Sequence, residues 1–98
     1  MVKNGMRPVH PGEVLLEDYL KPLGMSVNAL AKRLHVTPSR MNDVVLGRRG
    51  VTAETALRLA RFFGGDAQSW LNLQTMYELR SAEIESAKVI AKIEPLAA

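Results

Sequence analysis

The chain has 98 residues, of which 47% are hydrophobic and 23% charged, with a formal net charge of +3. This length suits one domain with a single modest core, and the lack of cysteine excludes disulfides and thiolate metal sites. No apolar stretch approaches the roughly 20 residues of a membrane span, and the N-terminus lacks the apolar region of a signal peptide. A cytoplasmic protein without a membrane segment is therefore expected.

The N-terminal part predicts a tail followed by a helix. Residues 1–9 are polar and aperiodic, which is typical of a flexible tail. A first helix is expected from Pro11 to about Lys21, because Pro22 and Gly24 follow and interrupt helices. Its apolar side is formed by Leu15, Leu16, Tyr19 and Leu20.

Residues 26–47 predict two short helices joined by a tight turn. The first begins after the capping hydroxyl of Ser26 and runs to about Leu34, with an apolar stripe. The second begins after the capping hydroxyl of Thr37, has Pro38 at its first position and ends before Gly47. The stripe of the first helix is formed by Leu30, Ala31 and Leu34.

The second of these helices has an apolar back and a polar front. Its back faces the first helix through Met41, Val44 and Val45. Its outward side carries the residues Pro38, Ser39, Arg40, Asn42 and Asp43. A helix that is small and polar in front, and followed at once by two arginines, suits the major groove of DNA.

Two further helices are expected in the second half. One begins at Thr52 and ends at Gly64 and Gly65. The next begins at Asp66 and can continue past residue 80, since glycine and proline are absent from 66 to 94. Their apolar positions include Ala56, Leu59, Ala60, Phe63, Trp70, Leu73 and Tyr77. The pattern predicts an all-α five-helix bundle over residues 10–80, with a C-terminal helical extension over 81–98.

Positive charge gathers around the two-helix unit. Residues 26–63 contain seven basic residues and two acidic ones, Asp43 and Glu54. This segment therefore has a net charge of +5, in a chain whose net charge is +3. The basic residues are Lys32, Arg33, Arg40, Arg48, Arg49, Arg58 and Arg61. This concentration indicates a polyanionic partner, although arginines on the solvated faces of ordinary helices are the plainer explanation.

Three segments carry a resemblance to a known family. LAKRLHVTPSRMNDVVLGRRGVTAETALRLARFFG resembles the helix-turn-helix core of the phage-repressor-like (XRE-type) DNA-binding proteins, with a lambda-repressor-like fold. HPGEVLLEDYLKPLGMS and WLNLQTMYEL flank that core and resemble the HigA/VapI-type antitoxins. Two departures stand out: the family often has glycine where this chain has His35, and Asn-Gly where it has Leu46-Gly47.

The resemblance implies both a function and partners. It implies a homodimeric repressor that binds a palindromic operator in double-stranded DNA and regulates its own operon. It also implies the antitoxin of a type II toxin–antitoxin (plasmid-maintenance) system, which neutralises a HigB-like mRNA endonuclease toxin. Two alternatives stay open: a solitary XRE-type regulator without a toxin, and a toxin-covering module with vestigial DNA binding.

The resemblance and the helical wheel together select base-reading candidates. By resemblance, Pro38, Ser39 and Asp43 reach base edges. Asn42 is suited to adenine and Arg40 to guanine or a phosphate. Asp43 is expected to accept from cytosine or to orient Arg40 through a salt bridge. In the alternative reading, Arg40 and Asp43 form an ordinary i, i+3 pair on a solvated face.

Four other residues are candidates for contacts with the DNA backbone. Arg48 and Arg49 follow the recognition helix, where adjacent arginines neutralise phosphates well. Ser26 and Thr37 lie at helix N-termini, whose free N–H groups can hold a phosphate. For Ser26 a plain capping role is the alternative.

Catalysis, metal binding and cofactors are not expected. His10 and His35 lack further ligands at suitable spacing, so His10 is expected before or at the cap of the first helix and His35 in a turn. The sequence shows no glycine-rich phosphate loop and no nucleophile beside a base. The aromatic residues Phe62, Phe63, Trp70 and Tyr77 follow helical stripes, which favours packing in the core or a dimer over base stacking.

Overall fold

A computed structural model describes residues 7–97, and within that range every regular element is helical. Of the expected flexible tail, residues 1–6 lie outside the described residues. Arg7 pairs with Glu13 on the first helix, with Nη2 and Oε2 2.6 Å apart. The five predicted helices are all present, so the predicted fold class is confirmed. No helix among the described residues has the length and apolar character that crossing a bilayer requires.

The first helix is longer than expected and is widened in its middle. It comprises α1 (Pro11–Val14), a π-helical stretch (Leu15–Leu20) and α2 (Lys21–Leu23), which follow one another without a break. The helix runs two residues beyond the expected end near Lys21, because Pro22 lies inside it and does not interrupt it. The wider π turn comes just before Pro22, where its ring would otherwise press on a carbonyl one turn earlier. The helix ends at Gly24, in the left-handed conformation with φ 65°.

The helix-turn-helix unit forms as predicted. Helix α3 spans Val27–Leu34 and α4 spans Pro38–Val45. The Ser26 hydroxyl accepts from the Ala29 N–H at 3.0 Å, and the Thr37 hydroxyl accepts from the Arg40 N–H at 3.2 Å. Between the helices His35 takes the left-handed conformation with φ 61°, so it occupies the position that glycine often fills in the family.

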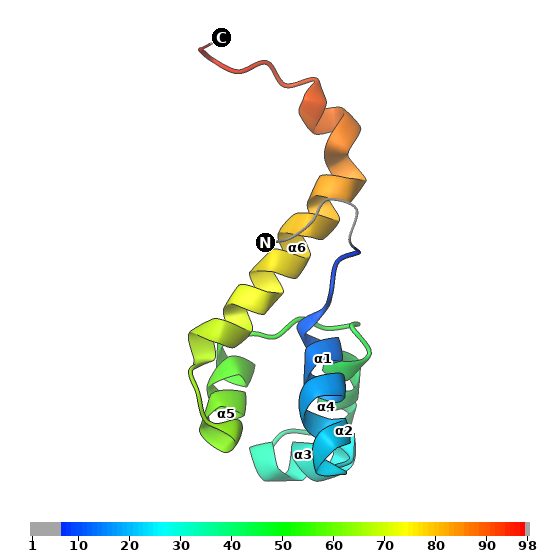
Figure 1. Cartoon of the computed structure of the whole chain (residues 1–98), viewed down its shortest axis with the longest axis vertical. Helices are drawn as coiled ribbons and strands as arrows, with labels where there is room; N and C mark the ends of the chain where they lie inside the picture. The colour runs from blue at the N-terminus through cyan, green and yellow to red at the C-terminus, as the bar shows by residue number, and fades with distance from the viewer. Residues whose placement is uncertain (1–6, 98) are drawn as a thin grey trace.

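The last two helices differ in how far they are packed. Helix α5 spans Ala53–Phe63, capped by Thr52 and ended by Gly64. Helix α6 spans Ala67–Ala91 and is capped by Asp66, whose carboxylate accepts from the Ser69 N–H at 2.7 Å. It passes residue 80 unbroken, so the expected division between 10–80 and 81–98 falls inside one helix. Figure 1 shows its second half extending away from the bundle.

The core lies where the predicted apolar stripes meet. Its buried members are Leu15, Leu20, Leu30, Ala31, Leu34, Met41, Val44, Val51, Ala56, Leu59 and Trp70. Tyr19 lies between Phe63 and Trp70, with ring centroids 4.8 and 5.3 Å away, which confirms the packing role expected of those two aromatic residues. Helix α3 packs on α4 and α5 packs on α6, and α1 bridges α4 and α6.

Gly12 permits the closest approach between two helices. A Cβ atom at this position would lie 1.9 Å from the backbone oxygen of Val44, which is closer than any real contact. Helix α1 therefore presses its backbone directly against α4, the helix with the polar front. The sequence pattern did not indicate this role for Gly12.

Candidate nucleic-acid interface

The polar front of α4 remains open to solvent. Met41 and Val44 on its back are fully buried, so apolar contacts hold the helix from behind. On the front, Pro38 and Ser39 are exposed, and Asn42 and Asp43 are partly exposed. Helix α4 thus presents a small, polar, unobstructed face beyond its own core, as the sequence predicted.

Two of the predicted base-reading side chains, Asn42 and Asp43, already have partners in α4 or in the segment that follows it. The Asn42 amide donates to the Pro38 carbonyl at 3.0 Å, so it must rotate before it can bind bidentately to a base. The Asp43 carboxylate faces Arg48 at 3.6 Å and Arg49 at 4.0 Å. Arg40 pairs elsewhere, so the expected Arg40–Asp43 pair is not what the structure shows.

Arg40 points toward α5. Its Nη2 donates to the Thr55 hydroxyl at 2.8 Å and to Glu54 Oε1 at 3.2 Å. Thr55 is almost completely buried, and only 25% of the Arg40 side chain is exposed. This orientation differs from the base-reading one that the helical wheel indicated, because the wheel cannot show a partner on another helix.

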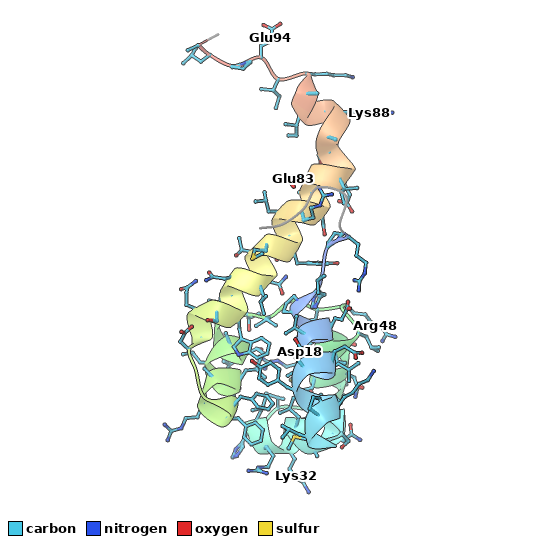
Figure 2. All side chains as sticks on the ribbon, viewed as in Figure 1. Asp18, Lys32, Arg48, Glu83, Lys88 and Glu94 are labelled. Carbon is cyan, nitrogen blue, oxygen red and sulfur yellow. The ribbon has the colours of Figure 1, made fainter. Side chains whose placement is uncertain are left out.

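The arginine-rich segment after α4 is fixed by backbone hydrogen bonds. The N–H groups of Arg48 and Arg49 donate to the Asp43 carbonyl at 2.8 and 3.2 Å. Both side chains are largely exposed, and Figure 2 shows Arg48 pointing away from the bundle. Two cations beside the open face of α4 are well placed to neutralise phosphates.

Gln74 of α6 holds the chain just after this segment, at Val51. It is a buried polar residue whose Oε1 accepts from the Val51 N–H at 2.7 Å, while its Nε2 donates to Glu78 at 2.9 Å. A Cβ atom at Gly50 would lie 2.9 Å from the Gln74 amide, so this glycine allows the close approach. Both roles escaped the sequence analysis, since they depend on residues more than 20 positions apart.

His10 joins the segment to the first helix. Its Nδ1 accepts from the Gly12 N–H at 2.8 Å, which confirms the expected capping role. The ring lies edge-on to Tyr77 with centroids 4.8 Å apart, and it lies close to Gly47. Burial lowers the pKa of His10, opposed by a hydrogen bond with the backbone of Arg49 and by the charge of Glu78. Neutral His10 therefore acts as a structural link.

The predicted basic concentration is only partly available to a ligand. Arg40 and Arg58 both pair with Glu54, and Arg33 lies over the Phe62 ring at 4.8 Å from its centroid. Of the seven basic residues between 26 and 63, five are exposed and Arg40 and Arg58 are partly buried. The exposed ones are Lys32, Arg33, Arg48, Arg49 and Arg61. The charge count had already subtracted Asp43 and Glu54, but it could not show which cations pair with them: Arg40 and Arg58 pair with Glu54, and Arg48 and Arg49 face Asp43.

The helix N-termini at Ser26 and Thr37 begin α3 and α4, which together line a shallow hollow. Its lining is formed by Asn28, Ala29, Lys32, Val36 and Pro38. Both hydroxyls are exposed and act as caps, as the plainer interpretation of Ser26 held.

Over residues 7–97, no three His, Cys, Asp or Glu side chains cluster as metal ligands would.

Comparison with known proteins places this geometry in a family. The helix-turn-helix family model matches residues 16–70. The chain belongs to the helix-turn-helix family. It is 61% identical over 87 residues to virulence-associated protein I of Dichelobacter nodosus, covering 89% of this chain and 81% of that protein.

Two solved structures from Pseudomonas aeruginosa are similar along nearly the whole chain. PA4674 in complex with its operator DNA has 45% identity and a TM-score of 0.89, covering 96% of this chain and 100% of that one. The antitoxin HigA with the higBA promoter has 44% identity and a TM-score of 0.88, covering 92% and 99%. The resemblance to XRE-type proteins and HigA/VapI-type antitoxins is therefore confirmed.

Proposed function

We propose that this chain is a sequence-specific DNA-binding repressor that acts as the antitoxin of a type II toxin–antitoxin system. The observation that carries the proposal is the open polar front of α4, held by a buried back and flanked by Arg48 and Arg49. The operator-bound and promoter-bound relatives support it, because they share the fold at more than 40% identity. Its place of action is the cytoplasm, and it needs no catalysis, metal or cofactor of its own.

In this proposal the front of α4 reads bases and its surroundings hold phosphates. Pro38, Ser39, Asn42 and Asp43 reach base edges in the major groove, with Asn42 leaving its bond to Pro38 as it binds adenine. The backbone contacts come from Arg48, Arg49 and the helix ends at Ser26 and Thr37. Arg40 does not read bases directly in this scheme, since its side chain is held at α5.

The repressor acts as a homodimer. One copy presents a single recognition helix, and a palindromic operator needs two of them about 34–36 Å apart on one face of the duplex. The second half of α6 offers the seam, because it exposes large apolar side chains beyond its own bundle. These are Leu79, Ile84, Val89 and Ile90 of α6, followed by Ile93 just beyond its end.

The partner in the antitoxin role is a HigB-like mRNA endonuclease encoded beside this chain. Co-expression of the adjacent short reading frame followed by co-purification tests this part. A stable complex that relieves the growth arrest caused by the toxin is expected. If the neighbouring product neither binds nor inhibits growth, the chain is a solitary regulator.

DNA binding is tested with a duplex covering the promoter of the gene that encodes this chain and a shuffled duplex of equal length. Asn42→Ala should weaken promoter binding by about 1–3 kcal/mol and leave shuffled binding almost unchanged, because it removes a base contact. Arg48→Ala should weaken both and lower the salt dependence, because it removes a phosphate contact. Equal binding of both duplexes by the unmodified chain would reject the repressor proposal.

A further inference from the structure

One carboxylate joins three helices of the DNA-binding unit. Glu54 lies at the start of α5 and pairs through Oε1 with Arg40 of α4 at 3.2 Å. Its Oε2 pairs with Arg58 at 3.0 Å. Arg58 Nη1 in turn donates to the carbonyls of Leu34 at 2.7 Å and His35 at 3.4 Å, at the end of α3. We call Arg40, Glu54, Thr55 and Arg58 the polar clasp.

We propose that the polar clasp sets the orientation of α4, so that Arg40 and Glu54 determine operator specificity without contacting a base. This inference rests on the proposed function. It assigns Arg40 a positioning role in place of the base-reading role that its place on the helix predicted.

The connection between α3 and α4 restrains the two helices at one end only, between Leu34 and Pro38. Only three residues, His35 to Thr37, separate the two helices, and His35 is already in the left-handed conformation. The apolar contacts behind α4, through Met41 and Val44, hold it in place but have no directional preference. Hydrogen bonds do have a directional preference, because they weaken steeply when the donor–hydrogen–acceptor angle departs from linear.

The clasp supplies directional bonds at the end of α4 that enters DNA first. Arg40 is the third residue of α4, one position after Ser39. Its guanidinium is held by a neutral acceptor, the buried Thr55 hydroxyl, as well as by a charge. At the other end, Arg58 satisfies α3 carbonyls that helix geometry leaves without a partner. The end of α3 and the start of α4 are thereby tied to the same point on α5.

Ionisation keeps the clasp closed at neutral pH. Arg58, followed by Arg40, holds the pKa of Glu54 below its usual value through hydrogen bonds and charge. Glu54 is therefore a carboxylate throughout the range in which DNA binding is measured. Both of its oxygens accept, and both arginines stay paired.

If the charge of Glu54 is removed, its electrostatic effect and its positioning effect predict opposite changes in promoter affinity. Removing a negative charge from a chain that binds a polyanion strengthens the attraction to every DNA sequence. Loss of the clasp instead lets α4 tilt, which weakens the promoter contacts and leaves the sequence-independent ones. The ratio of promoter to shuffled affinity therefore separates the two effects.

The experiment measures binding of the full chain to the promoter and shuffled duplexes by fluorescence anisotropy at one salt concentration. The variants are Glu54→Gln, Arg40→Gln and the double change. Each single change should lower the affinity ratio about tenfold, and the double change should lower it no further, because both break the same connection. Glu17→Gln is the matched control: it removes a carboxylate from an exposed ion pair with Lys21 and should leave the ratio unchanged.

Glu54→Asp separates position from charge. It keeps the carboxylate but withdraws it by one methylene, so the clasp predicts a lower ratio and a purely electrostatic role predicts no change. All variants are compared below their unfolding temperatures, as monitored by circular dichroism. The aspartate variant keeps the test valid if the glutamine variant does not fold.

Three outcomes would overturn the inference. The first is a Glu54→Gln or Glu54→Asp variant with the ratio of the unmodified chain. The second is an additive, roughly hundredfold loss in the double variant, which would make Arg40 an independent base reader. In both cases an unmodified chain that prefers its promoter leaves the repressor proposal intact. In the third, the unmodified chain binds both duplexes equally, and the repressor proposal fails together with the clasp.

Discussion

The two halves of α6 have opposite surroundings. The first half is packed on α5 and α1, with Trp70 and Gln74 buried, and it supports the segment that carries Arg48 and Arg49. In the second half, large apolar side chains such as Ile84 and Ile90 are more than half exposed. Figure 2 shows the labelled Glu83 and Lys88 side chains on this projecting half and Glu94 on the segment beyond its end.

This difference separates two tasks along one helix. The packed half completes a single bundle that orients a recognition helix. No residue in the projecting half is buried, yet it carries apolar side chains that water disfavours. We therefore expect changes in the packed part to act on folding, and changes in the projecting part to act on assembly and thereby on DNA affinity.

The largest effect is expected from Gly12→Ala, which should destabilise the packed part by about 3 kcal/mol or more. Its Cβ atom would overlap the Val44 backbone oxygen, and a backbone contact cannot relax as a flexible side chain does. Denaturant unfolding measures the loss. Gly24→Ala is the control, because its added Cβ meets open space and only the left-handed conformation, worth about 1 kcal/mol, opposes it. Equal losses for both variants would contradict the close packing of α1 on α4.

The second prediction concerns the projecting half. Ile90→Lys should leave the unfolding of the bundle unchanged and shift the chain from dimer to monomer. Promoter binding should weaken about hundredfold, because two linked recognition helices bind DNA far more tightly than one. The added positive charge alone would strengthen DNA binding, so a decrease identifies the lost dimer.

Ala82→Lys is the control for that change. It adds the same charge to the same helix and removes no large apolar side chain. Sedimentation and anisotropy measure the two quantities. If the Ile90→Lys variant stays dimeric and binds the promoter with full affinity, the second half of α6 is not the dimer interface.

The smallest effect is expected from pH, acting through His10 in the packed part. Its pKa is lowered on folding, so below about pH 6.5 the unfolded chain binds more protons than the native one. Stability should therefore fall as the pH decreases from 7 toward 5.5, because a proton on Nδ1 would displace the Gly12 N–H.

His10→Asn tests this assignment, since asparagine caps a helix without titrating. The variant should lose the dependence in this range, while carboxylates such as Asp66, whose pKa is also lowered, act only at lower pH. Unchanged pH dependence in the variant would assign the effect to another group.

The sequence predicted what local chemistry determines. Hydroxyl or carboxylate caps at Ser26, Thr37, Thr52 and Asp66 each bind an N–H three residues on. The apolar stripes meet in the core because helical spacing alone places them on one face. The polar front of α4 follows from the same rule, so its exposure could be predicted without knowing the other helices.

What the sequence could not predict depends on the angles between helices. The partner of Arg40 lies 14 residues away on α5, and the partner of Gln74 lies 23 residues away. Charge counting therefore could not show that Arg40 and Arg58 share Glu54, and the helical wheel treated Arg40 as a base reader. The close approach at Gly12 was missed for the same reason, whereas the π turn before Pro22 is local and was missed because a proline was expected to end the helix.

Hydroxyl-radical footprinting of the promoter duplex tests the central claim most directly. Two copies of α4 in successive major grooves should protect two patches on one face of the DNA, centred about 10–10.5 base pairs apart and symmetric in sequence. Ile90→Lys should abolish that paired pattern at the same concentration. Uniform protection along the duplex, or a single patch that Ile90→Lys leaves unchanged, would contradict the account.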